Sequence, residues 1–304
     1  MGQESILDSG RSGTVFCNLC GSHSSEHLFS KKGYHLVRCN DCDLAYIANP
    51  PDEAGIKAIY TTEATYHDEL LDSASDDHAR HRRTAQQHIA MLQYFRPTLE
   101  GLKIFDIGCS SGIFLDAARD MGMRCHGAEL SPETSAFARQ HYNLDVHHGD
   151  WRDAGFDAAS FDVVTLFDVI EHLPDPLAEL TAIRRLLKPG GLLLQSTPDI
   201  DGLFPRASYK LARKLDYWPH PEPPHHLFQF SQATLSAMVR KAGYSVEGAR
   251  HTAIDMSYNF GTPESWRISP KMLAYAAVFA PIALLGKVLG KGDWLYLGAT
   301  PKRS

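Results

Sequence analysis

The feature that most constrains the fold of this chain begins at Lys103, where short apolar runs start to alternate with stretches of helical periodicity. This alternation is typical of a parallel β-sheet whose strands are joined by crossover helices. One run, Phe161–Phe167, is apolar almost throughout, as a central strand covered on both faces should be. Seven strands are expected, at about Lys103–Ile107, Arg124–Ala128, Leu144–His148, Phe161–Phe167, Leu192–Ser196, Tyr244–Arg250 and Trp294–Thr300. The sequence therefore predicts an α/β, Rossmann-like fold.

Helices are expected between these strands, at about Gly112–Met121, from Ser131, at Pro176–Leu187 and at Ser231–Ala242. Ser131 is a good helix cap, and Pro132 suits the first helical position. Another helix precedes the first strand and runs to about Tyr94, with an apolar side that includes Ala85, Ile89, Leu92 and Phe95.

Composition limits the class of partner. The chain has 304 residues, enough for two domains or for one large domain with a small appendage. Its net charge of −6 and isoelectric point of about 6.2 argue against a dedicated nucleic-acid binder, which would have a basic domain. The polar N-terminus has no charged leader followed by an apolar run, so we expect no secretory signal and a cytoplasmic protein.

The strongest sign of a ligand is the loop between the first strand and its helix, Asp106-Ile-Gly-Cys-Ser-Ser-Gly112. Ligands of open α/β sheets bind beyond the carboxyl ends of the strands, and Gly108 and Gly112 let the backbone approach closely. The dinucleotide fingerprint G-x-G-x-x-G fails, because Ser110 replaces its second glycine. Asp106 would repel a pyrophosphate, but it favours the sulfonium and ammonium groups of S-adenosylmethionine (SAM).

Residues after the second and third strands extend this expected cofactor site. Glu129 closes the second strand, where an acidic side chain can accept hydrogen bonds from both ribose hydroxyls. Asp150 and Trp151 follow the third strand, where an acid can meet an adenine amino group and an aromatic ring can cover the base. Asp150 can also be a turn or helix-cap residue. The expected cofactor contacts are Asp106, Gly108, Cys109, Ser110, Gly112, Glu129, Leu130, Asp150, Trp151 and Asp168.

Six segments together resemble a known family. They are FDIGCSSG (105–112), the acid Glu129, GDW (149–151), FDVVTLFDVIEHL (161–173), LLKPGGLLLQSTP (186–198) and HHLFQFSQATLSAMVRKAGY (225–244). They are similar to class I SAM-dependent methyltransferases of the ubiquinone-biosynthesis type. The resemblance implies a seven-stranded sheet whose last strand runs antiparallel. It also implies cofactor roles for Asp106, Gly108, Gly112, Glu129 and Asp150, with Asp168 near the methionine end.

Two cysteine pairs near the N-terminus predict a metal site. Cys17-Asn-Leu-Cys20 and Cys39-Asn-Asp-Cys42 have the C-x2-C-x18-C-x2-C spacing of four-thiolate zinc sites. Thiolates fill all four positions and leave none for water, so we expect a structural Zn²⁺ bound by Cys17, Cys20, Cys39 and Cys42. A catalytic zinc and disulfides are the alternatives. Such a ribbon ahead of a methyltransferase domain partly resembles sugar C-methyltransferases, which usually carry a further C-terminal domain.

The expected organisation is a disordered tail (1–15), a zinc ribbon (16–48), a helical linker or lid (49–100) and a methyltransferase domain (101–304). Two insertions exceed what the fold requires, at about 199–224 and 251–293. Their aromatic residues, and two in the linker, are either pocket or lid walls or core: Tyr60, Tyr66, Phe204, Tyr209, Tyr217, Trp218, Tyr258, Phe260 and Trp266.

The second insertion contains 15 residues without a charge, Met272–Gly286. A membrane-spanning helix needs about 20 apolar residues, and Pro281 lies inside this run. A helix pair that is either buried on the domain or lines a substrate pocket is favoured. A helix lying on a membrane surface through 272–289, and a true span, are the alternatives.

Histidines are the expected catalytic groups. If the segment after the fourth strand is helical, Asp168, Glu171 and His172 share one face, where they either order the loop or bind a divalent cation. Related quinone O-methyltransferases carry a similar Glu-His run. His225 and His226 follow a proline-rich loop, and an oxygen nucleophile usually needs a base. The candidates are His226, His225 and His172.

These patterns predict a SAM-dependent methyltransferase that acts on a small biosynthetic molecule, most readily at oxygen. C- or N-methylation of a sugar or amine is the first alternative. The second is a docking module in which the ribbon binds a carrier or pathway protein and the methyltransferase domain is vestigial.

Overall fold

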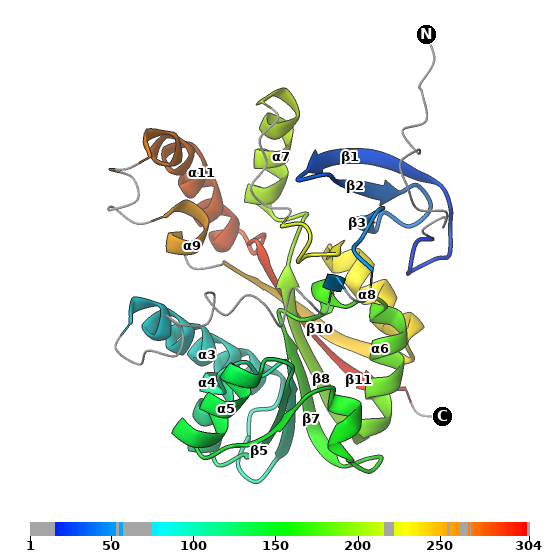
Figure 1. Ribbon diagram of the computed structural model, residues 1–304, viewed down its shortest axis with the longest axis vertical. Helices are drawn as coiled ribbons and strands as arrows, with labels where there is room; N and C mark the ends of the chain where they lie inside the picture. Colours follow the sequence, from blue (N-terminus) through cyan, green and yellow to red (C-terminus); the bar gives the residue numbers. More distant parts are fainter. Residues whose placement is uncertain are drawn as a thin grey trace.

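The computed structural model describes residues 16–52, 55–56, 75–215, 222–253, 256–261, 267 and 269–302. The expected disordered tail lies outside these residues, as do Tyr60, Tyr66, Tyr217, Trp218 and Trp266. The described chain forms one large mixed sheet flanked by helices and a smaller sheet above it (Figure 1).

The large sheet has the order β10-β11-β8-β7-β4-β5-β6. Its strands are β4 (Lys103–Ile107), β5 (Arg124–Glu129), β6 (Asp145–His148), β7 (Phe161–Phe167), β8 (Leu187–Pro198), β10 (Tyr244–Thr252) and β11 (Trp294–Pro301). Only β11 runs antiparallel to its neighbours. The predicted α/β, Rossmann-like fold with an antiparallel last strand is therefore confirmed.

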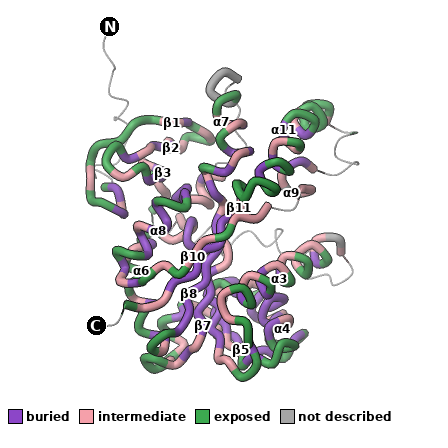
Figure 2. The backbone as a smooth tube through the Cα atoms, turned by 180° about the vertical axis from the view of Figure 1, so that it is seen from behind, coloured by how far each residue is buried: buried purple, intermediate pink, exposed green. Residues whose placement is uncertain are grey.

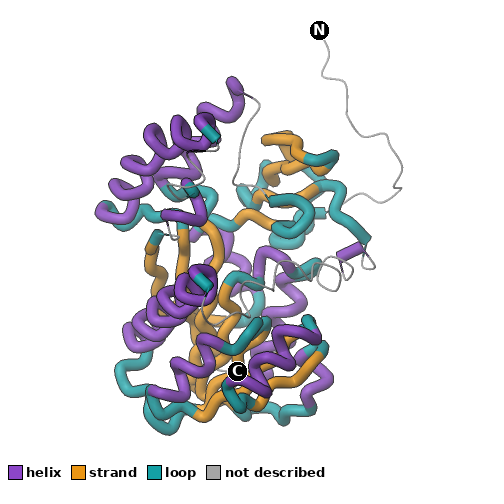
Figure 3. Tube along the Cα trace, turned by 60° about the vertical axis from the view of Figure 1, so that its left-hand side comes forward, coloured by secondary structure: helices purple, strands orange, loops and turns teal. Residues whose placement is uncertain are grey.

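Helices cover both faces of this sheet (Figures 1 and 3). On one face lie α3 (Asp76–Phe95), α4 (Ile113–Asp120) and α5 (Pro132–His141), and on the other lie α6 (Pro176–Ile183) and α8 (Gln232–Lys241). The helices α7 (Leu203–Leu215), α9 (Met256–Phe260) and α11 (Pro270–Val288) pack against one another in a separate cluster. Side chains of a strand alternate between two cores, because successive residues point to opposite faces. Ile104 packs with the α3, α4 and α5 side, whereas Phe105 packs with the α6 and α8 side.

Some boundaries differ from the sequence predictions. Helix α3, for which the apolar side predicted only the end, begins at Asp76, where Ser75 accepts a hydrogen bond from His78 N and caps it. The helix expected to reach Leu187 ends at Ile183 and continues as a 3-10 turn, Arg184–Leu186. Strand β8 begins at Leu187, five residues early.

The apolar run of the second insertion forms one helix, α11, so the expected helix pair is wrong. Pro281 lies inside it without ending it. In the part of the chain that the structure describes, α11 is the one helix long and apolar enough to cross a membrane, judged by length and composition alone. Only 22% of its most apolar stretch is buried.

The cysteine region folds as a small antiparallel sheet, β1-β2-β3-β9 (Figure 1). Strands β1 (Ser25–Lys31), β2 (Tyr34–Cys39) and β3 (Ala45–Ile47) come from the N-terminal region. Strand β9 (Phe228–Gln229) comes from the segment directly after His225 and His226. The ribbon and the large domain therefore share a sheet.

Candidate active site and metal centre

The glycine loop follows β4, the strand between β5 and β7. A Cβ atom on Gly108 would lie 2.7 Å from Val169 Cγ2. A Cβ atom on Gly112 would lie 2.7 Å from Leu144 Cδ1, and both glycines have positive φ angles, +74° and +81°. Both positions therefore require glycine, and the loop forms a cradle into which a ligand can approach the backbone.

Glu129 holds the shape of this loop. One carboxylate oxygen accepts a hydrogen bond from Ser110 N and the other accepts one from Ser131 N, each at 2.8 Å. A carboxylate has about four acceptor positions, so both oxygens keep capacity for ribose hydroxyls. Leu130, beside it, is 52% exposed at the end of β5, where an apolar side chain can cover a base.

Two buried carboxylates lie at the carboxyl ends of β4 and β7. Asp106 accepts a hydrogen bond from Thr165 Oγ1 at 2.6 Å, and Asp168 accepts one from Ser196 Oγ at 2.9 Å. Burial raises the pKa of each side chain to about 7, and the charge of Asp106 adds to the rise at Asp168. A cationic ligand relieves both penalties, so the residues present fit the sulfonium and ammonium groups of SAM.

Thr165 and Ser196 are site residues that the sequence analysis missed. Thr165 interrupts the apolar run 163–167, and Ser196 lies in the polar stretch that follows the apolar run 192–194. A hydroxyl near the carboxyl end of a buried strand is the signal that could have identified them, because a buried hydroxyl needs a partner.

Asp150 and Trp151 occupy structural positions. Asp150 accepts a hydrogen bond from Arg152 N at 2.9 Å and caps the 3-10 turn Trp151–Ala154, as the helix-cap alternative expected. The Trp151 ring is buried and its Nε1 donates to Glu179. A contact of either residue with adenine stays a prediction.

The Asp168–His172 segment is not an α-helix, so the expected common face is wrong. Asp168 has φ of +57° and precedes a single 3-10 turn, Ile170–His172. The structure instead brings Glu171 and His172 together with His226, with candidate ligand atoms within 4.8 Å of one another. The rings of His172 and His226 are 4.7 Å apart. These three side chains could hold a divalent cation or a substrate hydroxyl.

Backbone contacts fix this cluster. His172 Nδ1 donates to His225 O at 2.9 Å, which leaves Nε2 as the basic nitrogen of its ring. Burial lowers the pKa of His172 to about 4, so the ring is neutral near pH 7. Leu227 N donates to Glu171 O at 2.8 Å, and burial raises the pKa of the Glu171 carboxyl well above its usual range.

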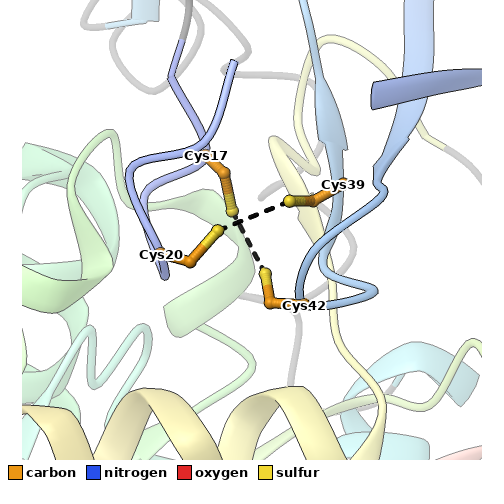
Figure 4. A group of neighbouring side chains, drawn as sticks. All are labelled: Cys17, Cys20, Cys39 and Cys42. Atoms are coloured by element: carbon orange, nitrogen blue, oxygen red, sulfur yellow. Dashed lines mark hydrogen bonds between the residues drawn. The ribbon is translucent and has the colours of Figure 1, made fainter. Parts of the chain in front are cut away.

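The four cysteine sulfurs converge on one point (Figure 4). Cys17 Sγ lies 3.4 Å from Cys42 Sγ, and Cys20 Sγ lies 3.5 Å from Cys39 Sγ. Zn–S bonds of about 2.3 Å in a tetrahedron place sulfurs about 3.8 Å apart. A disulfide needs about 2.0 Å, so the cluster fits Zn²⁺ and not a pair of disulfides. Cys109 in the glycine loop and Cys125 in β5 lie outside this cluster.

The first cysteine knuckle docks on the large domain. Asn18 Nδ2 donates to Asp175 at 2.8 Å, and Asn18 Oδ1 accepts from Leu177 N, which lies in the first turn of α6. Lys241 Nζ donates to Leu19 O at 2.5 Å. On the other side, β3 pairs with β9, and Ile47 N donates to Leu227 O. The ribbon therefore holds the strand that follows His226.

A cavity of about 370 Å³ lies at this junction. Its lining is mostly apolar and includes Phe16, Tyr46, Pro51, Ile56, Pro174 and Phe228. Pro174 lies two residues after His172, and Leu227, also in the lining, follows His226 directly. Phe204 and Phe260, once candidate pocket walls, are buried in a core between α7, α9 and α11 instead.

Comparison with known proteins decides the family. Residues 77–248, more than half of the chain, match the model described as a methyltransferase domain. This chain belongs to the methyltransferase domain family. It is 34% identical over 169 residues to a ubiquinone biosynthesis O-methyltransferase from Xanthomonas axonopodis pv. citri, a match that covers 51% of this chain and 69% of the relative. A protein of the same name from Cereibacter sphaeroides is 40% identical over 103 residues, which are 32% of this chain and 42% of that protein.

Solved structures agree on the fold of this methyltransferase. A SAM-dependent methyltransferase from Thermotoga maritima superposes with a TM-score of 0.52 at 19% identity and covers 81% of this chain and 100% of its own. A Haloferax volcanii structure containing the Trm112 methyltransferase activator has a TM-score of 0.52 at 23% identity, with 78% and 99% covered. The protein is a SAM-dependent methyltransferase, as predicted.

Proposed function

We propose that this methyltransferase transfers the methyl group to a hydroxyl oxygen of a small apolar or aromatic acceptor in a biosynthetic pathway. Bound SAM supplies an activated methyl group on a sulfonium. The chain supplies position and a proton acceptor. The observation that carries the proposal is the cluster of His226, His172 and Glu171, which are near the carboxyl end of β7, the strand that Asp168 directly follows.

Within this proposal, Glu129 binds the ribose hydroxyls, Leu130 covers the adenine, and Asp106 and Asp168 face the cationic end of the cofactor. Gly108, Cys109, Ser110 and Gly112 supply the backbone of the cradle. His226 takes the proton of the acceptor hydroxyl, and His172 orients that hydroxyl. His225 contributes through its carbonyl, which holds the His172 ring. In-line transfer gains much of its rate from such positioning.

The acceptor is proposed to occupy the cavity between the ribbon and the large domain. Its apolar lining suits a ring, and its two neighbouring segments carry His172 and His226. The structural zinc keeps β3 paired with β9 and so fixes one wall. Four reduced thiolates suit the cytoplasm, where thiols stay reduced. The alternative role of the same cluster is to bind a divalent cation through Glu171, His172 and His226.

The test is transfer of label from methyl-labelled SAM to a panel of catechols, phenols, sugar nucleotides and amines, followed by mass spectrometry of the product. Methyl ethers on catechols or phenols support the proposal. Label on nitrogen or carbon would overturn O-transfer and favour the amine or sugar alternative. SAM binding without transfer to any class would favour the docking role of the ribbon.

A further inference from the structure

Helix α11 has an outer face that the described protein does not cover. Beyond its first turn, the exposed apolar residues of α11 recur at steps of three and four, so they lie on one side of the helix. They include Ala274, Val278, Pro281, Leu285 and Val288, and Val288 is 82% exposed. The opposite side packs on Phe204 of α7 and Phe260 of α9. A surface helix in water normally presents polar residues on its outer side, and here both sides are apolar.

The charged residues within α7 and α11 have one sign. Helix α11 contains Lys271 and Lys287 and no acidic residue. Its partner α7 contains the exposed Arg206 and Lys210 and again no acidic residue. The whole chain carries a net charge of −6, so this basic pair of helices departs from the rest of the protein. Figure 2 shows exposed stretches along α11, which stands away from the large sheet together with α7.

The connections of α11 exclude a span. Leu203 N, at the start of α7, donates to Lys291 O at 2.9 Å, just after α11 ends. Asn259 of α9, which precedes α11, donates to Asp293 at 2.6 Å. The chain therefore enters and leaves this helical unit at the same place. A helix of 19 residues, about 28 Å long, that is tied in this way lies along a surface.

We infer that α7 and α11 form a docking surface for an anionic lipid membrane, with the outer face of α11 inserted among the acyl chains. Apolar side chains at the interface and basic residues beside anionic headgroups both stabilise such binding. A two-fold dimer through this face would bring the basic residues of two copies against each other, whereas an anionic bilayer neutralises them, so the charges favour the bilayer. The inference does not depend on the acceptor.

Docking would orient the active site. Helix α7 follows the carboxyl end of β8, and the start of β11 pairs there, with Trp294 opposite Pro198. The glycine loop follows β4 at the same edge of the sheet. The membrane-facing surface and the methyl-transfer site therefore share one edge.

The test is flotation of the full chain with vesicles of phosphatidylcholine alone or with about 30% phosphatidylglycerol. We expect binding to the anionic vesicles, weakened by salt, because the basic residues are screened. The double substitution Val278→Glu with Leu285→Glu should weaken binding at least about tenfold. Met121→Glu, at a residue 38% exposed beyond α4, is the matched control and should bind as the native chain does.

SAM affinity checks that each variant is folded, since neither position touches the glycine loop. Lys271→Gln with Lys287→Gln gives a second measurement that does not place charges on the apolar face, and it should lower binding to anionic vesicles alone. Equal flotation of the native chain and the Val278→Glu, Leu285→Glu variant would overturn the inference. So would flotation with neither vesicle, together with a dimer in solution that the same variant converts to a monomer.

Discussion

Asp106 illustrates how one buried carboxyl can select a cofactor. It is only 3% exposed, so ionisation there is penalised until a positive charge arrives. Asp106→Asn keeps the shape and the Thr165 contact and removes the charge. We expect SAM affinity to fall about tenfold or more, which is about 1.4 kcal/mol. Calorimetry measures the affinity, with Asp145→Asn on the edge strand β6, where the side chain is 73% exposed, as the control. Equal affinities would refute the assignment.

A second prediction at the scale of single residues concerns His226 as the proton acceptor. If it accepts the proton of the acceptor, His226→Gln should lower kcat by about a hundredfold or more and leave SAM affinity unchanged, because general bases contribute about 10² to 10⁴. His225→Gln is the matched neighbour and should lose less, since the carbonyl of His225, and not its ring, holds His172. An effect on KM alone would assign His226 to acceptor binding.

At the scale of elements, the sequence predicted the strands and loops whose formation depends mainly on neighbouring residues. All seven strands of the large sheet were placed by their apolar runs, and Glu129 and the glycine loop follow from two of them. Strand β9 was missed, because its two residues become a strand only by pairing with β3, about 180 residues earlier in the chain. Asp168 has a positive φ and accepts a hydrogen bond from Ser196, 28 residues later in the chain. An aspartate in the sequence does not by itself show that its backbone will adopt this conformation.

Disrupting the zinc ribbon should separate SAM binding from methyl transfer. Cys39→Ser removes one zinc ligand, so it should lower the melting temperature by several degrees, and chelation of the native chain should do the same. SAM affinity should stay within about twofold, because the ribbon contacts α6, α8 and β9 and not the glycine loop. Methyl transfer should be lost, since β9 fixes His226. The control is Cys125→Ser, a cysteine outside the cluster. Methyl transfer that survives chelation would show that the ribbon does not form part of the acceptor site.

At the scale of the molecule, three features converge on the carboxyl edge of the large sheet. The cofactor loop, the ribbon with its cavity, and the pair α7 and α11 are all reached from the ends of parallel strands. The first could be located from sequence, because glycine and acid spacing is local. The position of the other two depends on how segments far apart in sequence pack, so the sequence identified the segments without placing them.

The free energy of unfolding should change with pH because Asp106 and Asp168 titrate at the expected SAM site. Burial raises the pKa of Asp106 and Asp168 to about 7, whereas unfolded aspartates titrate near 3.9. Between these values the folded, SAM-free protein binds more protons than the unfolded chain. Its free energy of unfolding therefore falls as the pH rises through this window. Bound SAM favours the ionised carboxylates, so the complex should escape most of this loss.

Three histidines with lowered pKa values act in the opposite direction, and the comparison must remove their contribution. Desolvation lowers the pKa of His81 and His172 to about 4 and that of His88 to about 3, so their contribution to stability rises with pH up to about 6.5. Above about pH 5.5 these rings are neutral in the folded protein, so their contribution cancels in the difference between the SAM-bound and the free protein. The melting temperature of the SAM-saturated protein minus that of the free protein should therefore widen from about pH 5.5 to about pH 7.5. Scanning fluorimetry at fixed excess of SAM measures it, and Asp106→Asn should reduce the widening; a difference that stays constant would mean that these carboxylates do not face the cationic cofactor.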